Sequence, residues 1–288
     1  MTRAESPVPD LLLGVTSLDL PARTTRDRML EVAGRFREPE SLAVTLVKAL
    51  DAGAQAIYAV PSARLRAALR ELRRTVPVLA RLPLTPPGDD VAYEHVLLQP
   101  PPDAEPGMPY GLLGAAAVRA AMLPGSLTGD LASRVASRCE VESPMLGTRA
   151  WAGLAVAAPI TDLALAAGNA RFFERVTRFG SWRFGGVAGF ETQNLGLLLS
   201  RLRAWGIEPD FVIGAINPRG FGMKPDPETV LAQLAVDGVP VIASETRAGG
   251  TVPLAEGAAF ARECGARGLI ADLVEIDDVG AELRALAR

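Results

Sequence analysis

The amino-acid sequence predicts an α/β protein built as one closed (β/α)8 barrel, and three observations lead to that prediction. From Trp151 to the C-terminus, a short apolar run, a polar or glycine-bearing turn and an amphipathic helix recur five times. The N-terminal half supplies three further candidate strands, which gives the eight that close such a barrel. The length of 288 residues is the usual size of one such domain and can bury a substantial core.

The five apolar runs begin about 30 residues apart, which is the length that a strand, two loops and a helix require. Strands that alternate with helices at this spacing predict a parallel sheet with its helices outside, the arrangement of a TIM barrel. The five runs are Gly153–Ala158, Phe184–Ala188, Phe211–Ile216, Val241–Ser244 and Leu269–Ala271.

The N-terminal half completes the barrel. A helix is predicted from about Glu40 to Ala52, and a second one over Ser62–Arg74, with Ser62 as its N-cap. A third strand is entered through Pro77, a residue tolerated at the edge of a strand but not in its middle. The three strands predicted here are Leu11–Val15, Ala56–Val60 and Val78–Leu82.

About 70 residues separate the third predicted strand from the fourth, which is more than one connection needs. The first part is rich in proline and therefore irregular, although His95–Gln99 is a rival candidate for the fourth strand. Helices are predicted over Leu112–Leu123 and about Gly129–Cys139, the second capped by Thr128. Within a single domain of residues 1–288, we expect 84–150 to be a largely helical insertion, either a lid over the barrel mouth or a hairpin packed outside it.

Composition and charge narrow the class of protein. A hydrophobic content of 49% fits a packed globule, and no window reaches the ~18 continuous apolar residues of a membrane span. The N-terminal charges do not follow the order of a secretory signal, and Cys139 and Cys264 match no metal-ligand spacing. We therefore expect a cytoplasmic protein that does not bind membranes. The net charge of −3, without a basic stripe, argues against nucleic acid and leaves a small-molecule substrate, with a homo-oligomer still open.

The chain has one histidine, His95. This excludes zinc and iron sites that require two or more imidazole ligands. No G-x-S-x-G turn is present to hold a serine nucleophile. Carboxylates and lysine are therefore left for acid–base chemistry.

Carboxylates fall at or just beyond the ends of the fourth, fifth, seventh and eighth strands, on the face where barrels of this kind hold their active site. They are Asp162, Glu191, Glu245 and Asp272, and all four are candidate catalytic residues. Oxygen ligands from separate strands suit Mg²⁺, for which we predict Asp162, Glu191 and Glu245. Alternatively, a crowded carboxyl has a raised pKa and acts as general acid or base. The structural alternative is that each carboxylate caps the next helix or pairs with an arginine such as Arg81, Arg183 or Arg247.

The loop after the sixth strand adds two candidate catalytic residues, Asn217 and Lys224. Asn217 stands at the strand end and is expected to point inward. Lys224 lies near the position of the lysine in Schiff-base aldolases of this fold, where a desolvated ammonium group attacks a carbonyl. Contact with a substrate anion and a solvated lysine before a helix are the alternatives.

The loop after the seventh strand contains Arg247, Gly249, Gly250 and Thr251. Paired glycines before a helix start let backbone N–H groups approach a ligand, and barrels often bind phosphate with their last two loops. We predict a substrate-phosphate site here, with Arg247 as a bidentate clamp. Ordinary turn chemistry is the alternative.

Two resemblances follow from these residues. The stretch Val241–Glu245 with Ala248–Gly250 resembles the last two units of aldo-keto reductase-like barrels, which implies binding of nicotinamide phosphates. That family's Asp, Tyr, Lys and His tetrad has no convincing set of matches here: Tyr58 ends the second strand, but no lysine follows the third strand and His95 is displaced. The loop from Asn217 to Pro225, with Thr161–Ala166, is similar to uncharacterised aldolase-type TIM-barrel proteins, which implies the fold and no particular reaction.

Together these observations predict a lyase or isomerase that acts on a phosphorylated or carboxylated carbonyl compound through its strand-end carboxylates, with or without Mg²⁺. A nicotinamide-dependent reductase and a non-catalytic barrel that binds a metabolite or a partner are the alternatives.

Overall fold

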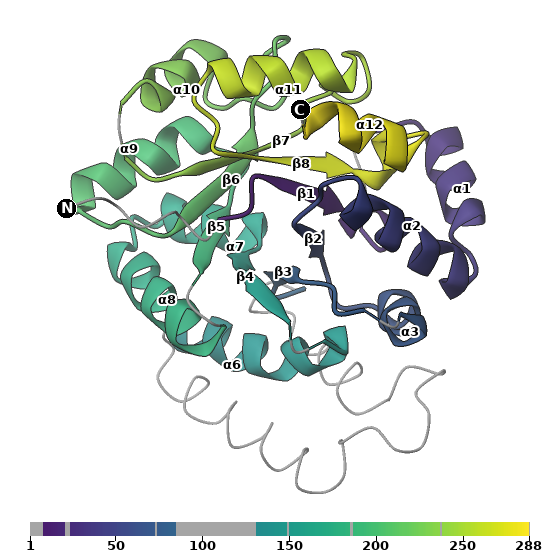
Figure 1. Cartoon of the computed structure of the whole chain (residues 1–288). Coiled ribbons are helices and arrows are strands. Elements are labelled where there is room, and N and C mark those ends of the chain that lie inside the picture. Colours follow the sequence, from purple (N-terminus) through teal and green to yellow (C-terminus); the bar gives the residue numbers. More distant parts are fainter. Residues whose placement is uncertain are drawn as a thin grey trace, which may run out of the picture.

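Eight parallel strands close into a barrel in the order β1 to β8 (Figure 1). The computed structural model describes residues 8–20, 24–72, 74–84, 131–148, 150–184, 187–236 and 238–287. Each strand pairs with the next, and β1 pairs with β8, so the predicted (β/α)8 TIM barrel is confirmed. The strands are Leu11–Gly14, Ala56–Ala59, Val78–Leu82, Trp151–Val156, Ala188–Glu191, Phe211–Ala215, Val241–Ser244 and Gly268–Asp272.

Helices surround the strands in Figure 1. Ser62 caps α3 as predicted, since its side chain accepts a hydrogen bond from the Leu65 amide. The α-helices are α1 Arg26–Arg35, α2 Pro39–Asp51, α3 Ala63–Glu71, α6 Leu131–Glu142, α7 Ala158–Ala166, α8 Ala170–Arg183, α9 Leu195–Trp205, α10 Pro227–Leu234, α11 Leu254–Glu263 and α12 Val279–Leu286. The described ranges also contain three short 3-10 helices, η1 Thr16–Leu18, η2 Ser143–Leu146 and η3 Leu273–Glu275.

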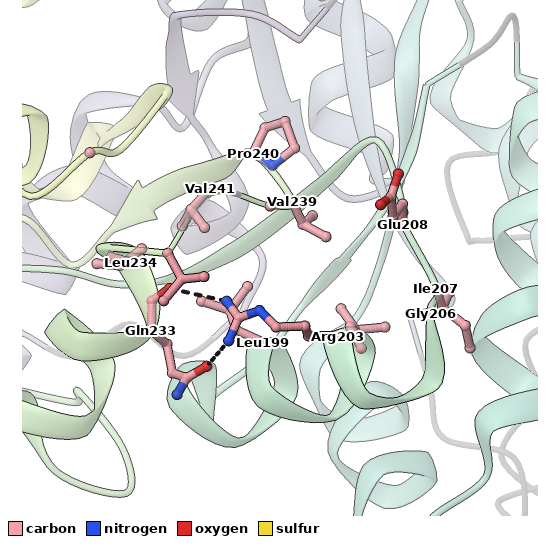
Figure 2. A pocket seen from close by; sticks show the side chains of 14 residues that line it. Leu199, Arg203, Gly206, Ile207, Glu208, Gln233, Leu234, Val239, Pro240 and Val241 are labelled. Carbon is pink, nitrogen blue, oxygen red and sulfur yellow. Dashed lines mark hydrogen bonds between the residues drawn. The ribbon is translucent and has the colours of Figure 1, made fainter.

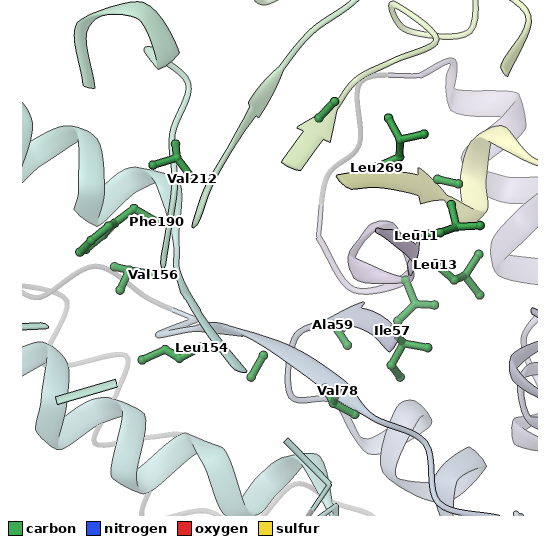
Figure 3. Close-up of a cluster of buried hydrophobic side chains, with 14 of the residues drawn as sticks. Leu11, Leu13, Ile57, Ala59, Val78, Leu154, Val156, Phe190, Val212 and Leu269 are labelled. Carbon is green, nitrogen blue, oxygen red and sulfur yellow. The ribbon is translucent and has the colours of Figure 1, made fainter. Parts of the chain in front are cut away.

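The alternation of side chains along each strand divides the core in two. Outward residues such as Leu11, Leu13 and Ile57 belong to the large cluster between the strands and the helices (Figure 3). Inward residues such as Leu12 and Ile270 form a smaller cluster that fills the barrel. Because this cluster fills the interior, only the inward residues at the strand ends remain available to a ligand.

The predicted fifth strand, Phe184–Ala188, was wrong. Phe184 is the C-cap of α8, and its ring packs edge-on against Trp151 with centroids 5.2 Å apart. The strand instead covers Ala188–Glu191. Glu191 is therefore the last residue of β5 and not part of the loop after it.

The described part of the 84–150 segment is dominated by α6. This helix packs against α8 and β3, and its Val135 and Cys139 are buried in the large core cluster. Glu140 on α6 also accepts a hydrogen bond from Arg183 on α8 at 2.6 Å. His95–Gln99, Leu112–Leu123 and Thr128 lie outside the described residues, so the lid stays a prediction.

Candidate functional site

A pocket of about 440 Å³ opens at the carboxyl ends of the strands, and we call it the mouth pocket. Its size suits a small molecule. Inward residues from six strands line it, and the loops after β1, β3, β4, β5, β6, β7 and β8 contribute others. The strand residues are Tyr58, Arg81, Glu191, Ala215, Ser244, Ile270 and Asp272, and the loop residues include Thr16, Ser17, Thr192, Gln193, Glu245 and Glu275.

An ion pair joins β3 to β5 on one side of the mouth pocket. Arg81 Nε donates a hydrogen bond to Glu191 Oε2 at 2.6 Å, and their side chains are 13% and 22% exposed. The same carboxylate oxygen accepts the Ala158 amide at the start of α7, at 2.9 Å. Burial disfavours the charge of Arg81, but Glu191 and Tyr58 together outweigh burial and raise the pKa of the guanidinium group. Of the structural alternatives for Glu191, pairing with an arginine is realised, whereas the amide that donates to it belongs to α7, which precedes β5, and not to the next helix.

Tyr58 on β2 lies beside this pair and is 3% exposed. Its hydroxyl has no hydrogen bond of standard geometry within the described residues, although Arg81 and Glu191 are close to it. Burial raises the pKa of Tyr58 well above its ordinary value, and the Glu191 charge raises it further. Tyr58 therefore stays neutral at physiological pH and keeps an O–H group that can donate a hydrogen bond to a ligand in the pocket.

Asp272 ends β8 on the opposite side of the mouth pocket. Its Oδ1 accepts hydrogen bonds from Ser17 Oγ at 2.5 Å and from the Val274 amide at 3.0 Å. The second bond caps η3, as the structural alternative for this carboxylate expects. Burial raises the pKa of Asp272, while the two hydrogen bonds oppose the shift.

Glu275 lines the same side of the pocket and was not among the predicted site residues. Burial raises its pKa from 4.5 to about 8, and the charges of Asp272 and Glu245 add to the shift while Arg247 opposes it. A carboxyl with such a pKa is present in both protonation states near neutral pH. The sequence signal was weak, because η3 is a single short turn and its burial depends on the whole fold.

Glu245 follows β7 and has a backbone φ of 52°, in the left-handed region that side chains other than glycine rarely adopt. Its carbonyl oxygen accepts a hydrogen bond from Asn217 Nδ2 at 3.0 Å. Asn217 is 1% exposed and also bonds Phe221 through both its Nδ2 and its Oδ1. Asn217 does not line the pocket; it holds the loop that presents Glu245 to it.

Asp162 lies inside α7 and not in the loop after β4. Its carboxylate accepts hydrogen bonds from Thr192 Oγ1 and from the Gln193 amide, at 2.5 and 3.1 Å. Thr192 and Gln193 line the pocket, whereas Asp162 does not. Burial raises the pKa of Asp162. This aspartate therefore positions the loop after β5.

The predicted magnesium ligands do not fit a metal site. Asp162, Glu191 and Glu245 are not brought together, and the described part of the chain contains no group of three or more His, Cys, Asp or Glu side chains that could hold a metal ion. Asp162 and Glu191 accept the hydrogen bonds given above, which occupy them in other contacts.

Lys224 is exposed and does not line the mouth pocket. Its carbonyl oxygen accepts the Gly196 amide at 3.0 Å, so its backbone links the loop after β6 to α9. An exposed ammonium group lacks the desolvation that activates a Schiff-base lysine.

The predicted phosphate loop is folded onto itself. The amides of Gly250 and Val252 both donate to the Arg247 carbonyl oxygen, and Arg247 Nε donates to the Val252 carbonyl oxygen at 3.1 Å. Thr251 Oγ1 donates to the Ala248 carbonyl oxygen at 3.0 Å. Arg247, Gly249, Gly250 and Thr251 do not line the pocket. The phosphate site stays a prediction, and the observed contacts are those of an ordinary turn.

A second pocket, of about 310 Å³, lies at the opposite end of the barrel (Figure 2). It is bounded by the end of α9, by α10 and by the start of β7 at Pro240 and Val241. Arg203 crosses it and donates to Gln233 Oε1 at 2.7 Å, so its guanidinium group already has a partner. Active sites of this fold lie at the other face.

No family model and no curated protein matches the sequence. Among solved structures, the chain is similar to the apo form of Gox0644, at 11% identity over 96% of this chain and 89% of that one, with a TM-score of 0.48. It is also similar to thiamine phosphate pyrophosphorylase from Pyrococcus furiosus, at 9% identity over 98% and 94% with a TM-score of 0.39. A third similar structure is the homocysteine methyltransferase MmuM from Escherichia coli in an oxidised form, at 14% identity over 98% of this chain and 96% of that one, with a TM-score of 0.44.

At this degree of similarity no activity carries over to the present chain. The fold assignment comes from the strand order and register of the chain itself. Among the described helices, none has the length and apolar character that crossing a membrane requires.

Proposed function

We propose that this protein is a small-molecule enzyme of the lyase or isomerase class that moves a proton at a carbon atom next to a carbonyl group. The supporting observation is that a carboxyl with a pKa of about 8, on Glu275, and the buried hydroxyl of Tyr58 line the same pocket. Groups with shifted pKa values in a cleft are candidates for catalysis.

The two sides of the pocket have different roles in the proposed reaction: one transfers the proton and the other stabilises the carbonyl oxygen. The ionised form of Glu275 takes the proton from carbon, and its protonated form returns it, since a pKa near the working pH keeps both forms populated. Tyr58 donates a hydrogen bond to the carbonyl oxygen as negative charge develops there, and the nearby Arg81 stabilises that charge. Return of the proton to a neighbouring atom gives isomerisation, and cleavage of the adjacent bond gives lysis.

A second candidate is a nicotinamide-dependent oxidoreductase, and the position of Arg81 favours it. Arg81 on β3 lies beside Tyr58 on β2, so this chain has an arginine near the tyrosine where the resemblance to aldo-keto reductase-like barrels implies a lysine. Titration of the protein with reduced nicotinamide cofactor, followed by cofactor fluorescence, tests this candidate. Stoichiometric binding would favour the oxidoreductase over the lyase or isomerase.

Exchange of carbon-bound hydrogen with solvent tests the proposed proton transfer. Hydroxyacetone, aminoacetone and pyruvate are incubated with the protein in D₂O, and the proton signals next to each carbonyl group are followed by NMR. We expect the protein to accelerate loss of these signals for at least one compound, and Glu275→Gln and Tyr58→Phe to slow the loss at least about tenfold.

The matched control is Glu263→Gln, which makes the same change at an exposed glutamate at the end of α11. It should leave exchange unchanged. Binding of a compound without any acceleration of exchange would contradict the proposed reaction and favour the non-catalytic barrel.

A further inference from the structure

The charges of the mouth pocket indicate which substrates it accepts. Arg81 is the cation among its described lining residues, and Glu191 already pairs with it at 2.6 Å. The side formed by β8 and η3 presents two more carboxyl groups, those of Asp272 and Glu275. Arg247 lies outside the lining and donates to the Val252 carbonyl oxygen. When these carboxyl groups are ionised, this side of the lining is negative, although burial raises the pKa of both groups.

Tyr58 provides a second and independent indication of a ligand. Its side chain is more than nine-tenths buried and lines the pocket, and its hydroxyl has no hydrogen bond of standard geometry within the described residues, with Arg81 and Glu191 close to it. A buried hydroxyl without a partner is costly, and a ligand oxygen in the pocket would satisfy it. Tyr58 lies on β2 and Asp272 on β8, two strands separated by β1, so both groups can contact one small molecule.

We propose that the mouth pocket takes a substrate with a positively charged amino group a few atoms from its carbonyl oxygen. The ammonium group lies toward Asp272, Glu275 lies beside the carbon atom between the two groups, and the carbonyl oxygen accepts the hydrogen bond of Tyr58. This substrate class rests on the proposed function and specifies it further. It replaces the phosphorylated or carboxylated substrate that the sequence predicts, because an anion would meet charge of its own sign in the described lining.

Electrostatic attraction is stronger in such a pocket than on the surface, since little water screens the charges. Asp272 is tied by Ser17 and the Val274 amide, so its oxygens are fixed in place before a ligand binds. Glu275 has no hydrogen bond among the causes of its pKa shift, unlike Asp272.

Three fragments that share a methyl ketone and differ in charge test this class: aminoacetone is a cation, hydroxyacetone is neutral and pyruvate is an anion. Their dissociation constants are measured by ligand-observed NMR at low salt. We expect aminoacetone to bind at least about tenfold more tightly than hydroxyacetone, with pyruvate the weakest. Added salt should reduce the preference for the cation.

Two variants test the ammonium contact and the carbonyl contact separately. Glu275→Gln should reduce the aminoacetone preference severalfold without changing the binding of hydroxyacetone, and Tyr58→Phe should weaken both compounds equally. Glu263→Gln, the exposed control, should change neither. Equal binding of aminoacetone and hydroxyacetone, stronger binding of pyruvate, or no measurable binding of aminoacetone would overturn the inference.

Failure of this inference differs from failure of the proposed function. Solvent exchange that proceeds best with hydroxyacetone or pyruvate would retain proton transfer and reject the cationic substrate. Preferential binding of aminoacetone without exchange of its hydrogens would retain the ligand class and reject the reaction.

Discussion

Replacement of Arg81 by methionine should destabilise the barrel more than the loss of a surface ion pair. The guanidinium group is bonded to Glu191 at 2.6 Å, and the two side chains are 13% and 22% exposed. Methionine keeps the length and apolar stem of the side chain but leaves the Glu191 carboxylate without its cation in a poorly hydrated site. Breaking a buried pair from one side costs about 3–5 kcal/mol. Because Glu191 retains some contact with water, we expect about 3 kcal/mol, the lower end of that range.

The free energy of unfolding is measured by urea denaturation, with circular dichroism as the signal and with a check that the m-value is unchanged. At about 2 °C per kcal/mol for a large domain, the melting temperature should fall by roughly 6 °C. Arg74→Met is the matched control. Arg74 Nη1 pairs with Asp51 Oδ1 at 2.5 Å, but the side chains are 46% and 60% exposed, so its loss should cost less than about 1 kcal/mol.

The single variant Glu191→Gln and the double variant with Arg81→Met and Glu191→Gln complete a double-mutant cycle for the ion pair. Removing both charges leaves no buried ion unpaired, so the double variant should recover much of the stability lost by Arg81→Met alone. If Arg81→Met costs no more than Arg74→Met, or if the double variant is as unstable as the two single losses added, the Arg81–Glu191 contact is not a buried ion pair in solution.

Three further predictions concern the mouth of the barrel. The folded-state pKa of about 8 for Glu275 lies above its ordinary 4.5, so the wild type should lose stability as the pH rises from about 5 through 8. Over the same pH range, the free energy of unfolding of Glu275→Gln should fall by less than that of the wild type, by on the order of a few kcal/mol. A difference in unfolding free energy between the two proteins that stays constant with pH would contradict the raised pKa of Glu275. Glu245→Gly should relieve the left-handed φ of 52° and raise stability by about 1 kcal/mol in urea denaturation, while a loss would show that the conformation is not strained. Thr246→Val removes a buried hydroxyl that has no hydrogen-bond partner among the described residues, and it should stabilise by about 1 kcal/mol; lower thermal stability would mean that the hydroxyl has a partner in solution.

The sequence predicts the barrel because its signal is local. Each strand is a short apolar run followed by a helix, and seven of the eight observed strands overlap their predicted ranges by most of their length. The fifth does not, because Phe184 is apolar for a different reason: it closes α8 and packs against Trp151. An apolar residue at the end of an amphipathic helix and one at the start of a strand look alike in sequence, and only the packing of α8 distinguishes them.

The site is harder to predict, since it depends on which residues point inward. Glu191, Glu245 and Asp272 do line the mouth pocket, as their places after apolar runs indicate. Arg81 follows the inward Leu79 by two residues, so strand alternation implies that it also points inward, and this signal was not used for a catalytic role. The pKa of Glu275 comes from burial by the whole fold and from the charge of Asp272, neither of which appears in a linear sequence.

Several features of the mouth oppose stability, and their concentration supports the proposal that the active site lies there. Glu245 holds a left-handed backbone, Glu275 is a partly buried carboxyl with a raised pKa, and the hydroxyl of Tyr58 has no hydrogen bond of standard geometry within the described residues. A simple substitution would remove each of these energetic costs: glycine for Glu245, glutamine for Glu275 and phenylalanine for Tyr58. A barrel shaped by stability alone would be expected to have these replacements at the three positions. The three residues line one pocket at the face where this fold holds active sites, so a bound substrate is the most direct reason for their presence.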